Sequence, residues 1–570
     1  MDISNVSILD LPDEILLTIF KKLNNIDLLY SLMGISQKLD RFACDFYFTK
    51  DVDLTTVSSN DTSNSRLDVM VDRFCTYILP RIHNNVACLS VQASLFQRIL
   101  HSSNYPNLRK LTLINLDIDT ASHMFNSTFV NFFDRQVVVE QLFSFVYFLE
   151  KSLFIRSYKH QISHLVVKIC DGFRCRPIEI IIAQTYVAIF TWLSNIQYLN
   201  LDGIDGNRYS RRLLRGLSSM ICYSSSVAHL RIRIHNFDDC LCLLDGRLSR
   251  LHTLIVKLDF VRHSRIIINN EAVLRKMCTF LQVYMGKALR KLKCFSPYVN
   301  RPTVSFDNAL VPVLCRMLNM EKLTLSFRVR RRNSFIDGIY LTDQAINYMS
   351  HLHTFIFDIA NDNTIINAHS KPSSDDIRRT FIERGHHVDC YIDYHTDKIG
   401  RCHVYSLPFT MERIHYITSR FPSGMFMNVR VLRVCDIDRS FENTFFAKIS
   451  CSFPLLSELT VSNTTERLEK PSHQWGKSKE ASSIIEYSCL VKLIVLDVHI
   501  DYVEQFLSSL NTRLPCLNKL HIRYEHLATV TENFTRDATR INCEKLKCII
   551  FEYDLHLVQS RDFYLYFPFL

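Results

Sequence analysis

The sequence is poor in residues that break or loosen regular structure. Its 570 residues include only 12 Gly, 14 Pro and 2 Trp. Collagen-like repeats and long Gly-rich linkers need far more glycine and proline, so both are excluded. Hydrophobic residues make up 47% of the chain and charged residues 22%, which is typical of folded proteins. A chain of this length predicts a large buried core and more than one domain.

Signals for export and for membrane insertion are also absent. None of the 19 cysteines forms a Cys-x-x-Cys pair, and no basic stretch followed by an apolar one opens the chain. The apolar run Leu142–Leu149 (LFSFVYFL) is too short to cross a bilayer. We therefore expect reduced, mostly buried thiols, a cytoplasmic or nuclear location and no membrane contact.

Motifs of catalysis and metal binding are missing as well. GxSxG, HExxH, GxxxxGK[ST] and GxGxxG do not occur. One stretch gathers six histidines and cysteines, but their spacing matches no zinc finger, and strand alternation would separate His387 from Cys390. These residues are His386, His387, Cys390, His395, Cys402 and His403. We expect no catalytic residue, no metal and no cofactor.

Residues 9–43 predict three short helices. Pro12 suits a first helical turn, and Asp13 and Glu14 place negative charge at the positive end of the helix dipole. An apolar stripe follows at helical spacing, Asp27 can cap a second helix, and a third begins at Gln37. So small a unit buries little apolar surface by itself. It needs a partner protein, or it caps the domain that follows.

The order L-P-x-E-I-L-x-x-I-F-x-x-L, then D-L-L, then S-x-x-L-x-x-x-A resembles the F-box family. The matching residues are Leu11, Pro12, Glu14, Ile15, Leu16, Ile19, Phe20, Leu23, Asp27, Leu28, Leu29 and Ser36. Leu39 departs from the pattern, because many members carry Trp there, so we expect altered packing. The resemblance implies a non-catalytic protein that docks on the Skp-type adaptor of a cullin–RING ubiquitin ligase. The implied adaptor contacts are Leu11, Pro12, Ile15, Leu16, Ile19, Leu28 and Leu29.

An apolar pattern, L-x-x-L-x-L, recurs from residue 86 to the end of the chain. Its second half alternates as a half-buried strand does, and helix-like segments such as Glu271–Met285 and Asp501–Leu510 lie between copies. Such units bury their apolar faces only by stacking. The copies start at Val86, Leu108, Ile162, Ile196, Val227, Leu251, Leu289, Met320, Leu352, Val429, Leu456, Leu490, Leu517 and Leu546.

The recurring pattern resembles leucine-rich repeats of an irregular variety. The expected fold class is α/β, with a small N-terminal three-helix F-box followed by an irregular leucine-rich-repeat-like solenoid. The expected boundaries are 5–50 for the F-box, 51–85 for a connector and 86–570 for the repeats. Residues 360–428 interrupt the register as an enlarged unit or a β-hairpin, with strands at 386–395 and 401–409. A globular α/β fold with a parallel sheet is the alternative.

Basic residues dominate the third, fifth and seventh positions of the repeats, which should line the open face of the sheet. Twelve are basic and four acidic, whereas the whole chain has 67 to 57. The basic set is Lys110, Lys168, Arg231, Arg233, Lys257, Lys291, Lys293, Lys322, Arg433, Lys492, Lys519 and Arg523. The acidic set is Asp202, Asp358, Glu458 and Glu552.

This bias predicts capture of an acidic or phosphorylated protein segment, unless the lysines only aid solubility. All of the basic set except Lys110 and Lys492 are the candidate substrate contacts. The run Phe327–Arg332 could be a phosphate clamp, a nuclear localisation patch or a solvated loop.

The function that the sequence favours is a substrate-recognition subunit of an SCF-type ubiquitin ligase. The alternative is a repeat-based protein-interaction or nucleic-acid-binding scaffold that does not act in ubiquitylation. Nucleic acid is not the expected partner, because aromatic and basic residues do not alternate along any segment.

Overall fold

A computed structural model describes residues 8–55, 64–116, 120–121, 124, 152–169, 178–202, 222–261, 291–367, 371–436, 439–467, 484–552 and 561–570. The chain forms two compact units, Met1–Ser326 with Gln344–Phe355, and Phe327–Asp343 with Ile356–Leu570. The apolar run at 142–149, the expected helix at 271–285 and most of the polar stretch at 55–65 lie outside the described residues. Among the described helices, none is long and apolar enough to cross a membrane.

Short helices open the first unit, as the sequence predicted. They are η1 (Ile8–Asp10), α1 (Asp13–Phe20), α2 (Asn25–Leu32), α3 (Gln37–Ala43) and α4 (Phe46–Thr49). Asn24, and not Asp27, caps α2, because its side chain accepts a hydrogen bond from Ile26 N at 3.0 Å while Asp27 already lies in the first turn. Ser36 caps α3 in the same way, at 3.2 Å from Leu39 N.

The interior of this helical segment is apolar and aromatic. Leu16, Phe20 and Leu39 are almost fully buried, and the Phe20 ring meets Phe42 edge-on with centroids 6.2 Å apart. Leu39, at the position where the family pattern often has Trp, therefore fills a core site. Arg73 on α5 (Asn64–Arg73) donates a hydrogen bond to Met33 O at 2.8 Å, which ties the segment to the elements that follow.

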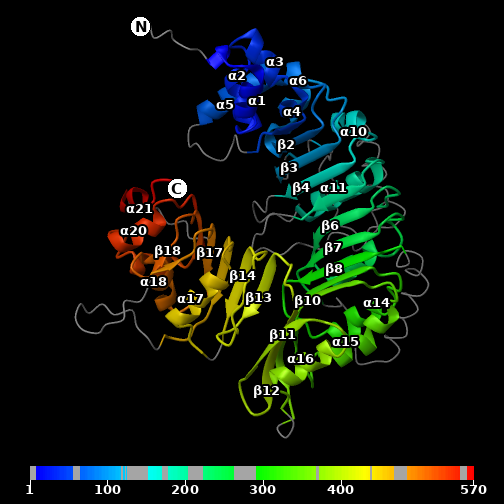
Figure 1. Ribbon diagram of the computed structural model, residues 1–570, viewed down its shortest axis with the longest axis vertical. Helices are drawn as coiled ribbons and strands as arrows, with labels where there is room; N and C mark the ends of the chain where they lie inside the picture. The colour runs from blue at the N-terminus through cyan, green and yellow to red at the C-terminus, as the bar shows by residue number, and fades with distance from the viewer. Residues whose placement is uncertain are drawn as a thin grey trace. The chain divides into compact units, whose positions relative to one another are not determined.

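A parallel sheet forms the rest of the first unit, and each strand pairs with the next strand in the chain (Figure 1). The strands are β1 (Asp51–Asp53), β2 (Cys88–Gln92), β3 (Lys110–Leu116), β4 (His164–Ile169), β5 (Tyr198–Leu201), β6 (His229–Ile234), β7 (Thr253–Leu258), β8 (Cys294–Val299) and β9 (Lys322–Arg330), whose residues from Phe327 on belong to the second unit. The register aligns Leu89, Leu111 and Leu165 in one row. All three are buried, so neighbouring strands share one continuous apolar layer.

Helices connect these strands and lie along one side of them (Figure 1). They are η3 (Phe74–Ile78), α6 (Leu79–Ile82), α7 (Ala93–Ser102), α10 (Leu153–Tyr158), α11 (Ile178–Trp192), α12 (Phe237–Leu243), η4 (Phe306–Leu310), α14 (Val311–Leu314) and η5 (Ile346–Tyr348). In α7, Phe96 and Ile99 are fully buried while Gln97 and Arg98 are exposed, so one face of the helix covers the sheet.

The second unit combines an antiparallel hairpin with a second parallel sheet. After β10 (Thr354–Ile365) and α16 (Ser374–Ile382), β11 (Val388–Tyr394) and β12 (Ile399–Ser406) pair antiparallel, and β12 also pairs with β10. The two strands predicted at 386–395 and 401–409 are thus confirmed as a hairpin. The parallel sheet has the order β13 (Arg413–Ile417), β14 (Val431–Cys435), β15 (Glu458–Ser462), β17 (Lys492–Val495), β19 (Lys519–Ile522) and β20 (Cys548–Phe551).

A small pair of strands and several helices complete the second unit. The strands are β16 (Ile485–Glu486) and β18 (Thr512–Arg513). The helices are α15 (Gly338–Gln344), α17 (Asn443–Ser452), α18 (Ile500–Leu507), α19 (Tyr524–Val530), α20 (Asp537–Cys543) and α21 (Arg561–Tyr566). Helix α18 confirms the helix that the sequence predicted at Asp501–Leu510.

Thirteen of the fourteen copies of the apolar pattern become strands that begin at the third residue of the copy. The exception is β8, which begins at Cys294, so this copy starts at Leu292 rather than Leu289. Leu292 is buried and Lys291 and Lys293 precede the strand, where they do not line its face. Strands β1, β13, β16 and β18 were not predicted. The coarse prediction of an α/β fold with a large parallel sheet is confirmed.

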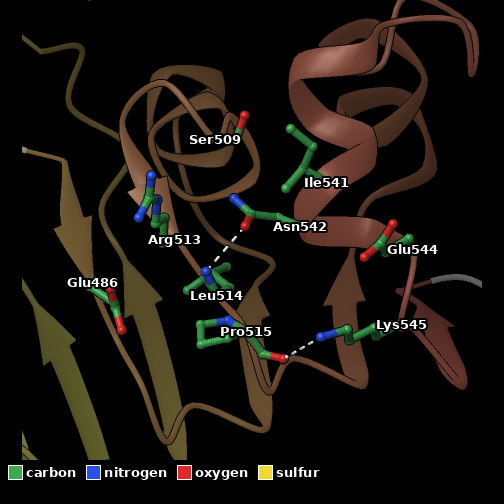
Figure 2. Close-up of a pocket in the computed structure, with 9 residues that line it drawn as sticks. All are labelled: Glu486, Ser509, Arg513, Leu514, Pro515, Ile541, Asn542, Glu544 and Lys545. Atoms are coloured by element: carbon green, nitrogen blue, oxygen red, sulfur yellow. Dashed lines mark hydrogen bonds between the residues drawn. The ribbon is translucent and has the colours of Figure 1, made fainter.

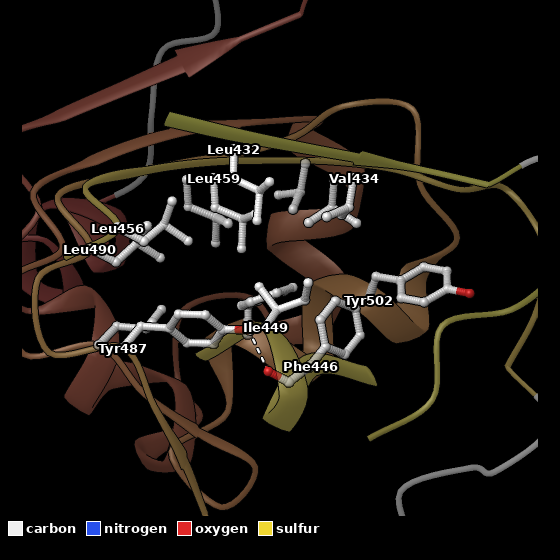
Figure 3. Packing of buried hydrophobic residues seen from close by; sticks show 14 of the residues in the cluster. Leu432, Val434, Phe446, Ile449, Leu456, Leu459, Tyr487, Leu490 and Tyr502 are labelled. Atoms are coloured by element: carbon white, nitrogen blue, oxygen red, sulfur yellow. Dashed lines mark hydrogen bonds between the residues drawn. The ribbon is translucent and has the colours of Figure 1, made fainter. Parts of the chain in front are cut away.

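The apolar core of the second unit lies between its parallel sheet and its helices (Figure 3). Leu432 and Leu459 stand side by side on β14 and β15, and both have no exposed surface. Beneath them Phe446 of α17 packs against Tyr502 of α18, with centroids 6.2 Å apart. Tyr487 donates its hydroxyl proton to Phe446 O at 2.9 Å, which satisfies a polar group inside the core.

We expect Leu459→Ala to lower the free energy of unfolding by about 2–5 kcal/mol, because it removes buried methyl groups and leaves a cavity. Thr460→Ala, on the opposite face of the same strand, should cost less than about 1 kcal/mol. Urea denaturation of both variants measures the difference. Equal losses would contradict the assignment of the two faces of β15.

Candidate functional site

The N-terminal helices expose an apolar stripe along α1. Ile15 is 48% exposed and Ile19 38%, and because they are spaced four apart they share one side of α1; Leu23, which is 48% exposed, follows in the turn after the helix. Pro12 is exposed at the start of the same helix. We call Pro12, Ile15, Ile19 and Leu23 the α1 face. In other proteins, large exposed apolar patches occur at surfaces that bind partners.

Ionic contacts hold the start of this helix in place. Lys38 donates hydrogen bonds to Leu9 O at 2.9 Å and to Leu11 O at 3.1 Å. Asp13 lies 3.3 Å from Lys38 Nζ and 3.1 Å from Arg41 Nη2. Helix α3 therefore positions the first turn of α1, and with it the α1 face.

The seven adaptor contacts implied by the family resemblance divide into two groups. Leu11, Pro12, Ile15 and Ile19 keep exposed or partly exposed side chains. Leu16, Leu28 and Leu29 have no exposed surface, so the structure places them in the core of the helical segment and not on a docking surface. Helical periodicity shows which residues share a stripe, but a broad apolar stripe has an inner and an outer edge.

Many of the predicted basic substrate contacts are paired with carboxylates. Asp202 lies 2.9 Å from Arg231 Nε and 2.7 Å from Lys257 Nζ, and Asp259 lies 3.0 Å from Arg233 Nη2. Asp259 is fully buried and also accepts a hydrogen bond from Asn300 at 3.0 Å. Asp202 and Asp259 lie just past the ends of β5 and β7, so these pairs run diagonally between strands, and Lys257 reaches across β6 to Asp202.

Other predicted substrate contacts also form ion pairs or hydrogen bonds within the chain. Lys293 lies 2.8 Å from Glu321, Arg523 lies 2.6 Å from Glu552, and Lys291 donates to Ser249 O at 2.9 Å. Lys168, Lys322 and Lys519 are exposed. Five of the ten predicted substrate contacts thus have acidic partners, namely Arg231, Arg233, Lys257, Lys293 and Arg523. The open face is less basic than the sequence pattern indicated.

A basic pocket of about 690 Å³ lies in the first unit, beside the residues that immediately precede strands β6 to β9. Arg250, Lys291 and Lys293 line it, against a single lining carboxylate, Glu321. His252 is also in the lining, and burial, helped by His229 and Lys293, lowers the pKa of His252. The pocket carries more positive than negative charge and could receive an acidic group.

A second pocket, of about 430 Å³, lies in the second unit (Figure 2). Its charged lining is balanced, with Arg513 and Lys545 against Glu486 and Glu544. Asn542, at its base, accepts from Leu514 N at 3.0 Å and donates to Thr512 O at 2.7 Å. Its amide is thus fixed by hydrogen bonds with the backbone that it supports.

Three of the six cysteines and histidines around residue 395, namely Cys390, Cys402 and His403, are buried in the hairpin. The sulfur atoms of Cys390 and Cys402 are 3.6 Å apart and both residues are buried. Its hydrogen bond with Cys390, together with burial, raises the pKa of Cys402, which keeps it a neutral thiol. His403 Nε2 lies 2.6 Å from Asp358 Oδ1. Within the described ranges, no three His, Cys, Asp or Glu side chains gather as a metal site.

No protein-family model matches this chain, and no curated protein sequence matches it either.

Arg233→Ala should lower the free energy of unfolding by about 3 kcal/mol, because it leaves the buried Asp259 without its charged partner. Lys168→Ala removes an exposed lysine from a nearby strand and should change stability by less than about 0.5 kcal/mol. Urea denaturation compares the two variants. A loss for Lys168→Ala as large as for Arg233→Ala would show that the pairing is not what stabilises this face.

Stability should also fall in acid because of His521. Burial, with Lys492 and Lys519 close by, lowers the pKa of His521 to about 4. Between pH 6.5 and 4 the unfolded chain therefore binds a proton that the folded chain does not, so the free energy of unfolding falls as pH decreases. His521→Gln should flatten this slope, whereas His387→Gln, at an exposed site of the same unit, should not. An unchanged slope in His521→Gln, followed by denaturation at several pH values, would refute the assignment.

Proposed function

We propose that this chain is a non-catalytic substrate-recognition subunit of an SCF-type cullin–RING ubiquitin ligase. Its N-terminal helices act as an F-box that docks on a Skp-type adaptor. Its parallel strands form an irregular leucine-rich-repeat-like array that captures an acidic or phosphorylated protein segment. Holding both partners at once raises the effective concentration of the ligase near substrate lysines, and no new chemistry is required.

The α1 face is the observation that carries this proposal. Ile15, Ile19 and Leu23 are exposed in a segment whose neighbouring apolar residues, such as Leu16 and Phe20, are buried. Apolar anchors that enter desolvated pockets of a partner supply most of the free energy of binding in protein interfaces. The same residues belong to the sequence pattern that resembles the F-box family.

The alternative is a repeat scaffold whose helical segment only caps the first strands. Contacts such as that between Arg73 and Met33 O fit this alternative as well as the proposal. A cap, however, needs an inner apolar surface only, and it gains nothing from an outer one exposed to water. The outer stripe on α1 favours docking.

Co-expression of the full chain with a Skp-type adaptor tests the proposal. Ile15→Asp combined with Ile19→Asp should reduce affinity for the adaptor by about 100-fold or more, because it places two charges in an apolar contact. Both positions are exposed, so the variant should fold, whereas a change at the buried Leu16 would unfold the segment.

The matched control is Leu510→Asp, which introduces the same charge at an apolar residue of the second unit that is 68% exposed. It should co-purify with the adaptor as the parent does. If the double variant also co-purifies as the parent does, with an unchanged circular dichroism spectrum, the ligase assignment fails.

A further inference from the structure

Three arginines contact one buried carboxylate in the second unit, and a fourth lies nearby against the Tyr416 ring. Asp362 of β10 accepts hydrogen bonds from Arg330 Nε at 2.9 Å and Arg401 Nε at 3.1 Å, and Arg328 Nη2 donates to it as well. Asp362 and Arg401 are at most 1% exposed and Arg328 is 4% exposed. Arg433 of β14, one of the predicted substrate contacts, completes the group. We call Arg328, Arg330, Arg401 and Arg433 the arginine cluster.

A bulge in β13 places an aromatic ring in this cluster. The Arg328 guanidinium lies 4.0 Å and that of Arg433 5.2 Å from the centroid of the Tyr416 ring. Tyr416 is an extra residue in its strand, because His415 pairs with Arg433 and Ile417 with Val434. Its φ of 62° lies in the left-handed region, which a tyrosine rarely adopts. A strained bulge that aims one side chain is typical of functional sites.

The cluster is not neutral. Burial alone would raise the pKa of Asp362, but Arg401, Arg328 and Arg330 outweigh burial and hold it at about 2. Asp362 is therefore fully charged, and it offsets one of the four arginine charges. Two nearby carboxylates have polar contacts of their own, since Asp358 of β10 is bound to His403 and Asp436, which follows β14, accepts from Ser419 Oγ at 2.7 Å.

Several guanidinium donors in the cluster are also unmatched. Among the described residues, no hydrogen-bond acceptor lies within reach of Arg328 Nε, Arg401 Nη2 or Arg433 Nε, although all three atoms are buried. Buried charged donors without acceptors are costly and call for an explanation such as an absent ion. A cluster built only for stability would balance its charges.

The cluster is partly open to solvent. The Arg330 side chain is 39% exposed and Arg433 is partly exposed, whereas Arg328 and Arg401 are buried. An anion that arrives at Arg330 and Arg433 would meet two planar forks, whose geometry matches the oxygens of phosphate and carboxylate groups. The buried pair would add its positive field without direct contact.

We infer that the arginine cluster binds one oxyanion, a phosphate or carboxylate group, held between Arg330 and Arg433 above Tyr416. This inference rests on the proposed function, because it names the chemical group by which the repeats would recognise an acidic segment. It also assigns a role to residues 360–428, because β10 and β12 of this interruption supply Asp362 and Arg401.

Isothermal titration of the full chain with sodium phosphate, at constant ionic strength set with sodium chloride, tests the inference. We expect saturable binding of one phosphate. Arg433→Gln and Arg330→Gln should each weaken binding about tenfold, since each removes a charge-assisted contact. Arg513→Gln, at an exposed arginine of the same unit, is the matched control and should bind as the parent does.

A second titration, with a hexaglutamate peptide, separates a free anion from an acidic protein segment as the source of the oxyanion. Binding of either probe that is weakened by Arg433→Gln supports the site and identifies its source. If neither probe binds, or if the Gln variants and the parent bind equally, the inference is overturned. Arg433→Lys, which keeps the charge but loses the fork, should bind with intermediate affinity and covers the case in which Arg433→Gln fails to fold. Adaptor docking is measured separately, so either proposal can fail without the other.

Discussion

The in-register hydrogen bonding of parallel strands is the constraint on which the rest of this structure depends. At the entry to each strand, one backbone N–H bonds to the preceding unit, as in Arg109 N to Ala87 O, Ser163 N to Arg109 O and Gln197 N to Ser163 O, each at 2.9 Å. This ladder fixes which side chains face the helices and which face outward. The same ladder makes side chains at equivalent positions lateral neighbours. Charged side chains on the outer face therefore pair with one another within the chain, which leaves fewer of them available to a partner.

Much of this organisation could be predicted from the sequence, because apolar alternation is a local signal. The start of most strands follows directly from it, as at Lys110 and Glu458. Strand β8 was placed three residues too early, because Leu289 and Leu292 both fit the pattern and only pairing with β7 distinguishes them. Strand β13 was missed because Tyr416 interrupts its alternation. A bulge is specified by contacts across strands and leaves a weak local trace.

The candidate sites were less predictable for a similar reason. The partner of Arg233 is Asp259, 26 residues later and outside the positions that the repeat pattern marks as outward-facing. Arg401 meets Asp362 only through the pairing of β10 with β12. Likewise, periodicity identified the apolar stripe of α1 but not which edge of it is buried. In each case the missing information is which residues far apart in the chain come into contact, and local sequence patterns do not give this.

We propose that the N-terminal helices present a docking face, while the strands that follow bury a separate apolar core. Hydrogen–deuterium exchange of the full chain, with and without a Skp-type adaptor, tests this most directly, because it reports where the chain is covered. The account predicts slower exchange on adaptor binding in peptides that cover α1 and its neighbours, and unchanged exchange in β14, β15 and the other strands of the second unit. Binding that leaves α1 unprotected, or that protects the repeats instead, would contradict it.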